Sequence, residues 1–401
     1  MAVNVSVPQI GTTTEAVERR ATERLNVKAA LLTNCIPPYW ISTFSSLAQR
    51  LRDFRIFLST PMEADRDWKP QWGDLAVTVQ KCWTYTVKRW HELGFSDDVW
   101  RHIPYDTLPI LLRHRPDVVI SAQLGFRTLQ AAIYRKLFPK TRLVVWTPLS
   151  EHSEKGLSAF RTLQRKALLR VVDAALVNGT SGRRYLLSLG VPHEKIFPLP
   201  YCADIQAHLR VPLKRGTSAA RRLLYVGQLV ERKGLLPFLN TLTEWLRHHP
   251  AVEVEFWIAG EGPLRPELEA FPACSQLRLR FLKSVAYEKL PDVYALGGIM
   301  VFPTLADEWG VVVNESMAAG LPVLGSRYSQ AVEELVTDGV TGWIFRPDQG
   351  AEMYAAIDRA LTASDVQLED MRRMARKRIQ VLHPEFGAEC FLRAARFAYA
   401  T

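Results

Sequence analysis

A chain of 401 residues is too long for one ordinary core and fits two domains of roughly 150 to 200 residues each. Hydrophobic residues make up 48% and charged residues 23%, which excludes a chain dominated by disordered or low-complexity segments. The net charge of +10 favours anionic partners, among which nucleic acid, acidic membrane surfaces and phosphorylated small molecules all qualify.

Targeting signals and cysteine usage indicate the cellular compartment of the protein. No uninterrupted apolar run approaches the roughly 18 to 20 residues that cross a bilayer. Residues 1–26 contain no apolar stretch followed by a small-residue cleavage site, so we interpret them as a loose tail and not as a signal peptide. The five cysteines are odd in number and form no Cys-x-x-Cys pair, which argues against a disulfide framework or a zinc ribbon. These features predict a cytoplasmic protein.

The first half of the chain alternates short apolar runs with helical patterns. The predicted strands are Ala29–Thr33, Arg55–Ser59, Val118–Ser121, Leu143–Trp146 and Ala174–Val177. The predicted helices are Trp40–Arg52, Phe126–Phe138 and Phe160–Val172, where apolar residues recur every three or four positions. This order predicts a doubly wound domain.

The second half repeats the alternation more clearly. Its predicted strands are Leu223–Gly227, Val252–Ala259, Leu277–Leu282, Ile299–Pro303 and Pro322–Gly325. Its predicted helices are Gly234–His249, Pro263–Phe271, Tyr287–Leu296 and Val311–Ala319. Continuous apolar strands between helices are typical of a parallel sheet that is covered on both faces.

The predicted fold class is therefore α/β, with two doubly wound domains that face each other across a cleft. Residues 27–205 form the first domain and 223–383 the second; 206–222, with a proline, several basic residues and no core pattern, join them. Residues 384–401 read as a further helix that could pack anywhere, including back on the first domain. Ligands of such sheets bind beyond the carboxyl ends of the strands, so chemistry is expected on the loops that follow strands.

The segment 302–322 is the richest in candidate functional residues. A strand ends there, a loop with Asp307, Trp309 and Gly310 follows, and a helix begins at Val311. The loop and the first helical turn can present unpaired amide groups to an anion such as a diphosphate. Glu315, within the first turns of that helix, could accept hydrogen bonds from two adjacent ribose hydroxyls. Asp307 would reach a transferred sugar instead.

A second loop of this kind follows the strand that ends at Gly227. It carries Arg232, with a planar guanidinium fork, and Lys233, with a point charge, which together suit a pyrophosphate. Acids in a first helical turn also complement the helix dipole, and basic loop residues are often merely solvated. Two loops suited to anions in one domain nevertheless favour a diphosphate site.

Here the sequence resembles the family 4 glycosyltransferases, which have two facing Rossmann-like domains in the GT-B arrangement. The resemblance covers about 223–361 and is carried by the following segments: Gly227, Arg232-Lys233-Gly234, 259–263, 281–284, 307–315 and 320–323. It implies that Arg232 and Lys233 hold the donor diphosphate, that Glu315 holds the ribose and that Asp307 orients the sugar. It also implies that the backbone at Lys283, Ser284 and Val285 meets the base, and that transfer is retaining and needs no metal or other cofactor.

The sequence departs from this family at two points. Asp307 stands where the first acid of the family signature is usually Glu, which shortens that side chain by one methylene. The glycine pair that often follows the first strand is missing, because this chain reads Thr33-Asn34-Cys35-Ile36-Pro37 there. His152, which follows a strand, lies about where family members often place a histidine near the reacting sugar; a lone loop histidine is more often incidental.

Other motifs bear on metals and partners. Asp65-Arg66-Asp67 spells a DxD triplet, but it lies in a polar loop, and no metal site is predicted. Basic helical segments at 134–136, 161–170 and 372–378 could lie against an anionic membrane surface on its inner face, or be solvated. A nucleic-acid partner is not expected, because no known module or basic and aromatic interleaving was found.

The sequence thus predicts an enzyme that moves a sugar from a nucleoside diphosphate sugar to a hydroxyl of a glycan or lipid-linked glycan, as in polysaccharide or glycolipid assembly. A sugar-nucleotide epimerase or phosphorylase of the same fold is one alternative. A non-catalytic module that binds nucleotide sugars is another. A dehydrogenase is disfavoured, because no Gly-x-Gly-x-x-Gly follows the first strand of either half.

Overall fold

The computed structural model describes residues 24–66, 68–216 and 219–400. Of the predicted tail 1–26, positions 1–23 lie outside the described residues, and strand β1 (Leu25–Thr33) already begins within its last two. Asp67, the last residue of the DxD triplet, also lies outside them.

The first sheet has seven strands, all paired in parallel. Their order is β3 (Val77–Val79), β2 (Leu51–Leu58), β1, β6 (Val118–Ala122), β7 (Arg142–Thr147), β8 (Ala174–Val177) and β9 (Ile196–Pro198). The helices around it are α2 (Pro38–Gln49), α3 (Thr107–His114), α4 (Phe126–Leu137), α5 (Ala159–Leu169) and α6 (Thr180–Ser188), with the short η1 (His193–Lys195). The five residues of β6 are all buried, as a strand with both faces covered requires.

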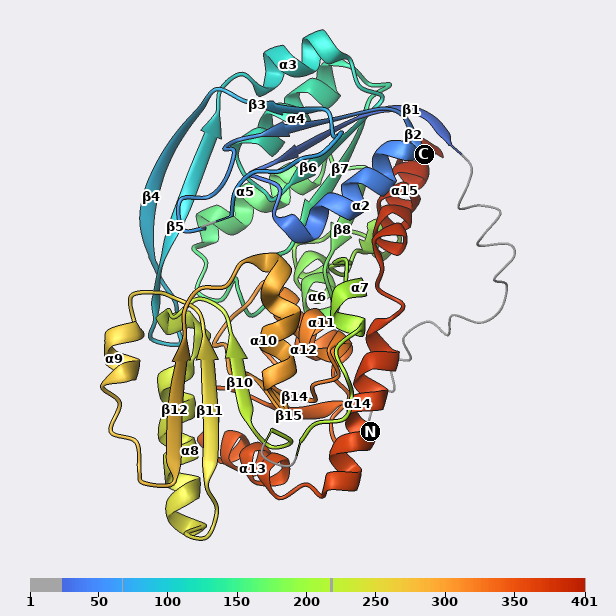
Figure 1. The fold of residues 1–401 in the computed structure, drawn as a ribbon. Helices are drawn as coiled ribbons and strands as arrows, with labels where there is room; N and C mark the ends of the chain where they lie inside the picture. Colours follow the sequence, from blue (N-terminus) through green and yellow to red (C-terminus); the bar gives the residue numbers. More distant parts are fainter. Residues whose placement is uncertain (1–23, 67, 217–218, 401) are drawn as a thin grey trace.

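The second sheet has six parallel strands. Their order is β12 (Leu277–Leu282), β11 (Val254–Ala259), β10 (Leu223–Val226), β13 (Ile299–Phe302), β14 (Val323–Ser326) and β15 (Gly342–Phe345). The helices of this unit are α8 (Leu235–His248), α9 (Arg265–Glu269), α10 (Leu290–Leu296), α11 (Val311–Ala318), α12 (Gln330–Leu335), α13 (Gly350–Leu361) and α14 (Asp365–Ile379), with the short η2 (Glu231–Lys233) and η3 (Tyr287–Lys289). Two parallel α/β sheets, one above the other in Figure 1, confirm the predicted fold class.

One predicted helix was too long. The helix expected over Trp40–Arg52 ends at Gln49, and β2 begins at Leu51. Arg50 lies between them with φ −100° and ψ 0°, outside the regular helical region. The apolar spacing continued because Leu51 and Phe54 belong to the same buried core as the helix, so spacing alone could not separate the two elements.

A long antiparallel hairpin belongs to neither sheet and was not predicted. It pairs β4 (Cys82–Trp90) with β5 (Ser96–Pro104). Figure 1 shows it extending from the upper unit down to the lower one. At its tip the amide of Ser96 donates a hydrogen bond of 3.0 Å to Glu231 of η2.

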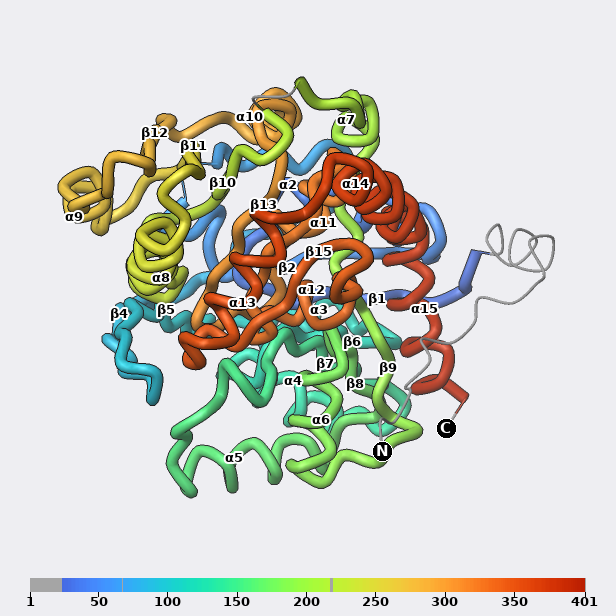
Figure 2. The backbone as a smooth tube through the Cα atoms, turned by 90° about the horizontal axis from the view of Figure 1, so that it is seen from below, coloured from blue at the N-terminus to red at the C-terminus, as the bar shows by residue number. Residues whose placement is uncertain are grey.

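The end of the chain returns to the first sheet. Helix α15 (Pro384–Ala400) follows α14 and packs against α2, β7 and β8, as Figures 1 and 2 show along one side of the molecule. Phe391 on α15 contacts the rings of Trp40, Phe44 and Trp146. The predicted joining segment, 206–222, contains the short helix α7 (Gln206–Leu209) and the buried residues His208 and Val211.

Candidate active site

Four loops meet at the carboxyl edge of the second sheet, after β10, β11, β12 and β13. Three of them touch so closely that only glycine fits at the contacts. Gly234 has φ +68°, and a Cβ there would lie 2.2 Å from the carbonyl oxygen of Pro303. A Cβ on Gly260 would lie 1.9 Å from the carbonyl oxygen of Gly227. These approaches hold the loops that carry the candidate residues against one another.

Arg232, Lys233 and Asp307 form one charged cluster. The Lys233 ammonium donates to Oδ2 of Asp307, and NH1 of Arg232 lies 3.6 Å from the same oxygen. Arg232 also reaches the tip of the hairpin, where its Nε lies 2.7 Å from Oδ2 of Asp97. The structure therefore brings together both predicted cations and the predicted sugar acid, with a second carboxylate from the first unit.

Burial and charge set the protonation of this cluster. Burial lowers the pKa of Lys233 to about 8, against the opposing effect of Asp307. Burial alone would raise the pKa of Asp307, but the charges of Lys233 and Arg232 bring it below its ordinary value. Asp307 is thus a carboxylate at neutral pH. It forms ion pairs with two cations that could instead bind an anionic ligand.

The loop after Asp307 turns into α11 through a left-handed residue. Gly310 has φ +99°, and a Cβ there would lie 2.6 Å from the Phe302 ring. The amide of Trp309 donates to Oδ1 of Asp307 at 3.3 Å, while its buried indole donates to Asn314 at 2.8 Å. Val311 begins the helix, where amide groups have no partner within the helix.

Glu315 lies deeper, on the second turn of α11. It is only 1% exposed, and its Oε2 accepts a 2.7 Å hydrogen bond from Tyr294, whereas its Oε1 has no partner among the described residues. The hydroxyl of Tyr287 also has no hydrogen-bond partner there; with Tyr294, Tyr287 acts to lower the pKa of this carboxyl. Burial raises the pKa of Glu315 to about 7.

A hollow of about 200 Å³ opens between the two units beside this cluster. Its lining comes mostly from the first unit and includes Tyr39, Trp68 and Tyr201, with Glu308 from the second. The charge of Asp307 contributes to raising the pKa of Tyr39 and Tyr201, although burial is the larger cause. The lining does not include Arg232, Lys233, Asp307 or Glu315, so the hollow adjoins the charged cluster only through Glu308.

The remaining predicted residues lie around the cluster. His152 stacks on Tyr328 with ring centroids 4.5 Å apart, and burial lowers its pKa. The carbonyl of Tyr328 accepts from the Asp307 amide, so His152 lies one residue away from the cluster and not in contact with it. Lys283 and Ser284 are exposed after β12, and Val285 is half-buried; they share the sheet edge with the cluster.

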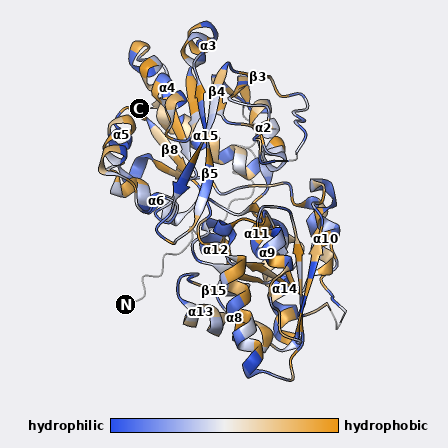
Figure 3. Cartoon of the chain, turned by 90° about the vertical axis from the view of Figure 1, so that its left-hand side faces the viewer, coloured by the Kyte–Doolittle hydropathy of each residue, from blue (hydrophilic) through white to orange (hydrophobic). Residues whose placement is uncertain are grey.

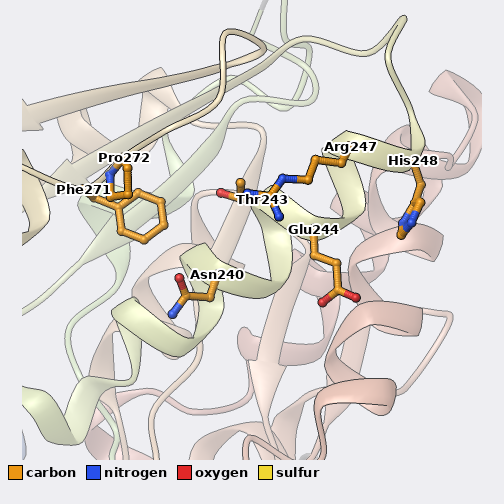
Figure 4. Close-up of a pocket in the computed structure, with 7 residues that line it drawn as sticks. All are labelled: Asn240, Thr243, Glu244, Arg247, His248, Phe271 and Pro272. Atoms are coloured by element: carbon orange, nitrogen blue, oxygen red, sulfur yellow. The ribbon is translucent and has the colours of Figure 1, made fainter.

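Two further features bear on where a ligand or metal could bind. Within the part of the chain that the structure describes, no three His, Cys, Asp or Glu side chains are grouped to hold a metal. Another hollow, lined by residues of α8 and by Phe271 and Pro272, lies on the outer turns of α8, and Figure 4 shows its side chains spread along the helix. Neither feature adds to the cluster described above.

Several residues at the site could not be found from the sequence. Asp97 reaches Arg232 because the hairpin tip folds across the two units, and nothing local marks it. Tyr39 and Tyr201, also not predicted, stack in series with the predicted Trp309, with successive centroids 5.7 Å apart. The aromatic and β-branched run at 82–90 was a usable signal for a strand, and so for the hairpin.

The two parallel α/β sheets, with the charged loops at the edge of the second, have the arrangement of the GT-B class of glycosyltransferases. Family comparisons agree on both units. The profile of the family "Glycosyl transferases group 1" matches residues 220–363, and that of the "Glycosyl transferase 4-like domain" matches 38–202. The chain belongs to the group 1 (family 4) glycosyltransferases, an enzyme family that uses nucleotide-sugar donors.

Curated relatives match over part of their length. Alpha-D-kanosaminyltransferase of Streptomyces kanamyceticus is 29% identical over 187 residues, 43% of this chain and 46% of the relative. D-inositol 3-phosphate glycosyltransferase of Nocardia farcinica is 26% identical over 225 residues, 51% of this chain and 48% of the relative. The matches thus span about half of each relative.

Solved structures match over nearly the whole chain. The apo form of the lipopolysaccharide outer core galactosyltransferase WaaB superposes with a TM-score of 0.68 at 13% identity, covering 92% of this chain and 99% of that one. HepE of Anabaena, solved in complex with UDP and glucose, gives 0.64 at 14% identity over 92% and 99%. At such identities these likenesses establish the fold alone.

Proposed function

We propose that this enzyme transfers a sugar from a nucleoside diphosphate sugar bound at the edge of the second sheet to an acceptor held by the first unit. The observation that carries the proposal is the cluster in which Arg232 and Lys233 share the carboxylate of Asp307. A donor diphosphate would compete with Asp307 and Asp97 for the two cations. Asp307, once released, would be free to accept hydrogen bonds from the transferred sugar.

The buried carboxylate of Glu315 suits the ribose. Its Oε1 is a buried acceptor without a partner among the described residues, and such an atom is costly unless a ligand donates to it. Ribose hydroxyls are donors of that kind. Trp309, Gly310 and Val311 would offer backbone amides to the phosphates, Gly227 would let the first loop approach them, and Lys283, Ser284 and Val285 would border the base.

The proposed reaction retains anomeric configuration and needs no metal. The bond from the anomeric carbon to the diphosphate breaks, the acceptor oxygen bonds to that carbon on the same face, and the acceptor proton passes to the leaving phosphate oxygen. Arg232, Lys233 and the helix amides stabilise the charge that develops on the leaving group. His152, stacked on Tyr328 beside the cluster, is proposed to contact the reacting sugar.

The acceptor is proposed to be a hydroxyl of a glycan or of a lipid-linked glycan. The hollow between the units is bordered by Tyr39, Trp68 and Tyr201, and flat aromatic faces suit the apolar faces of sugar rings. Glu308, exposed at its edge, lies next in sequence to the proposed sugar acid. We therefore propose a role in polysaccharide or glycolipid assembly on the cytoplasmic side of a membrane. In the described part of the chain, none of the helices has the length and apolarity that a membrane span requires.

A panel of nucleotides tests the donor half of the proposal. UDP, GDP and ADP and their sugars would be added separately, and the melting temperature measured; one nucleotide is expected to raise it, because a ligand that binds only the folded state stabilises it. Acceptor-dependent release of free nucleotide diphosphate then separates transfer from an epimerase, a phosphorylase or a binding module. The absence of a shift with every nucleotide would reject the donor site.

Replacement of Arg232 tests the cluster itself. Arg232→Ala is expected to lower turnover by about tenfold to a hundredfold, because one preorganised cation at the leaving group is lost. Arg221→Ala, which removes a surface partner of Asp365 at the far end of β10, is the matched control and should leave turnover unchanged. A loss below about fivefold in Arg232→Ala, at an unchanged melting temperature, would refute the assignment.

A further inference from the structure

The outer side of the first unit exposes large apolar side chains on three elements that lie next to one another. They are Trp83 (67% exposed) and Tyr85 (50%) on β4, Phe160 (70%) and Leu163 (65%) on α5, and Leu129 (47%) and Leu137 (60%) on α4. We call this surface the hairpin face. Figure 3 views this side, with α4, α5 and the hairpin together in the upper unit. A large exposed apolar patch on a folded protein marks an interaction site more often than chance.

Contacts between the elements show that the face is continuous. Tyr85 pairs across the hairpin with Arg101. Arg89 on β4 and Arg165 on α5 both pair with Glu154, so α5 lies beside the hairpin. Helix α4 contacts β5 directly, and Gln130 of α4 donates a 2.6 Å hydrogen bond to the carbonyl of Pro104.

The charge on this face is positive and largely uncompensated. Neither α4 nor α5 contains an acidic residue, whereas α5 and its end carry Arg161, Arg165, Lys166 and Arg170. Arg165 pairs with Glu154, but Arg101, Arg161 and Lys166 form no ion pair within the described residues. The exposed apolar side chains therefore share this surface with cations that have no ion-pair partner among the described residues.

We propose that the hairpin face docks on the surface of an anionic lipid bilayer. Exposed aromatic and aliphatic side chains would enter the boundary between headgroups and acyl chains while the cations meet lipid phosphates, the combination that binds amphipathic surfaces to membranes. A second copy of the chain is a poorer occupant, because pairing this face with itself would oppose like charges. The inference rests on the proposed function, in which the acceptor is lipid-linked. The hairpin tip contacts Glu231 and Arg232, so docking of this face would hold the donor cluster near the membrane that carries the acceptor.

Sedimentation of the full chain with vesicles tests the proposal. Wild type is expected to bind vesicles of phosphatidylcholine with phosphatidylglycerol, and to bind pure phosphatidylcholine much less. Phe160→Ser combined with Leu163→Ser should weaken binding at least about tenfold, because two apolar side chains no longer leave water. Arg161→Gln combined with Lys166→Gln should weaken it and reduce its dependence on salt.

Matched controls lie on α14, the other basic helix. Val366→Ser removes an apolar side chain that is 72% exposed, and Lys377→Gln removes an exposed cation; both should bind vesicles as wild type does. The proposal is overturned if the α14 variants lose binding and the α5 variants keep it, or if wild type forms a dimer through α5 and ignores anionic vesicles. The nucleotide-induced rise in melting temperature, measured in each variant, reports separately on the proposed function.

Discussion

At the scale of single residues, burial of the Glu315 carboxyl lowers stability at neutral pH, and the same carboxyl is proposed to bind the ribose. Its folded-state pKa of about 7 lies above the ordinary 4.5, so between these values the folded protein holds a proton that the unfolded chain has lost. Stability from this group is complete below about pH 4.5 and is lost as pH rises through 7. The full loss is on the order of 3 kcal/mol, from a shift of about 2 to 3 units at about 1.4 kcal/mol each.

Glu315→Gln is expected to remove this pH dependence, because an amide does not ionise. Denaturant midpoints at pH 5 and pH 8 would be compared between the two proteins. The variant should lose less stability over that range than wild type and should respond less to the nucleotide that stabilises wild type. Equal pH slopes in the two proteins would show that the carboxyl does not titrate as described.

At the scale of elements, the approach of two loops depends on Gly234, which begins α8. Its φ of +68° costs an L-residue about 1 kcal/mol, and a Cβ would also meet the Pro303 carbonyl at 2.2 Å. Gly339 has a similar φ of +75°, but a Cβ there would meet nothing within 4 Å. Alanine at Gly339 would therefore carry only the cost of a left-handed backbone. Alanine at Gly234 would carry that cost and also a steric clash with Pro303.

Gly234→Ala is expected to lower the free energy of unfolding by more than about 2 kcal/mol, and Gly339→Ala by about 1 kcal/mol. Chemical denaturation measures both. Gly234→Ala should also weaken nucleotide binding, because the loops that carry Lys233 and Asp307 must separate. Equal losses in the two variants would mean that the Pro303 contact does not constrain the loops.

Elements with a regular apolar pattern were predicted from sequence, and the exposed hairpin was not. The predicted strands Ala174–Val177 and Leu277–Leu282 have the bounds that the structure gives, because a short apolar run and an alternation of apolar and basic residues are both typical of strands. The hairpin was missed because β4 is exposed along nearly its whole length, so it has no buried face to set a period. Arg232, Lys233 and Asp307 were found because each lies on a strand–loop–helix junction that local sequence marks.

At the scale of the whole molecule, the sequence did not indicate which distant segments contact one another. The sequence left open where the last helix packs and gave no means to pair Arg232 with Asp97. Contacts between the units are made by side chains far apart in sequence: Gln330 donates to the carbonyl of Pro148 at 2.6 Å, and Arg184 lies 2.6 Å from Glu333. Such pairs depend on the assembled fold and leave no local pattern.

The return of α15 to the first unit couples the two ends of the chain. Phe391 is fully buried against Trp40, Phe44 and Trp146, so the core of the first unit includes a residue that follows the entire second unit. Phe391→Ala is expected to cost about 3 to 5 kcal/mol, because a large ring leaves a cavity in a close-packed core. Tyr399→Ala, at a site 55% exposed on the same helix, should cost little.

Hydrogen exchange at the buried amides of β6, measured at increasing denaturant concentration, would report on the first unit of each variant. If α15 is part of that core, Phe391→Ala lowers the midpoint of this signal, and nucleotide binding to the second unit persists at denaturant concentrations where the first has already unfolded. A midpoint equal to that of Tyr399→Ala would mean that α15 rests on the first unit without stabilising it. The first unit would then fold from residues that precede the second unit alone.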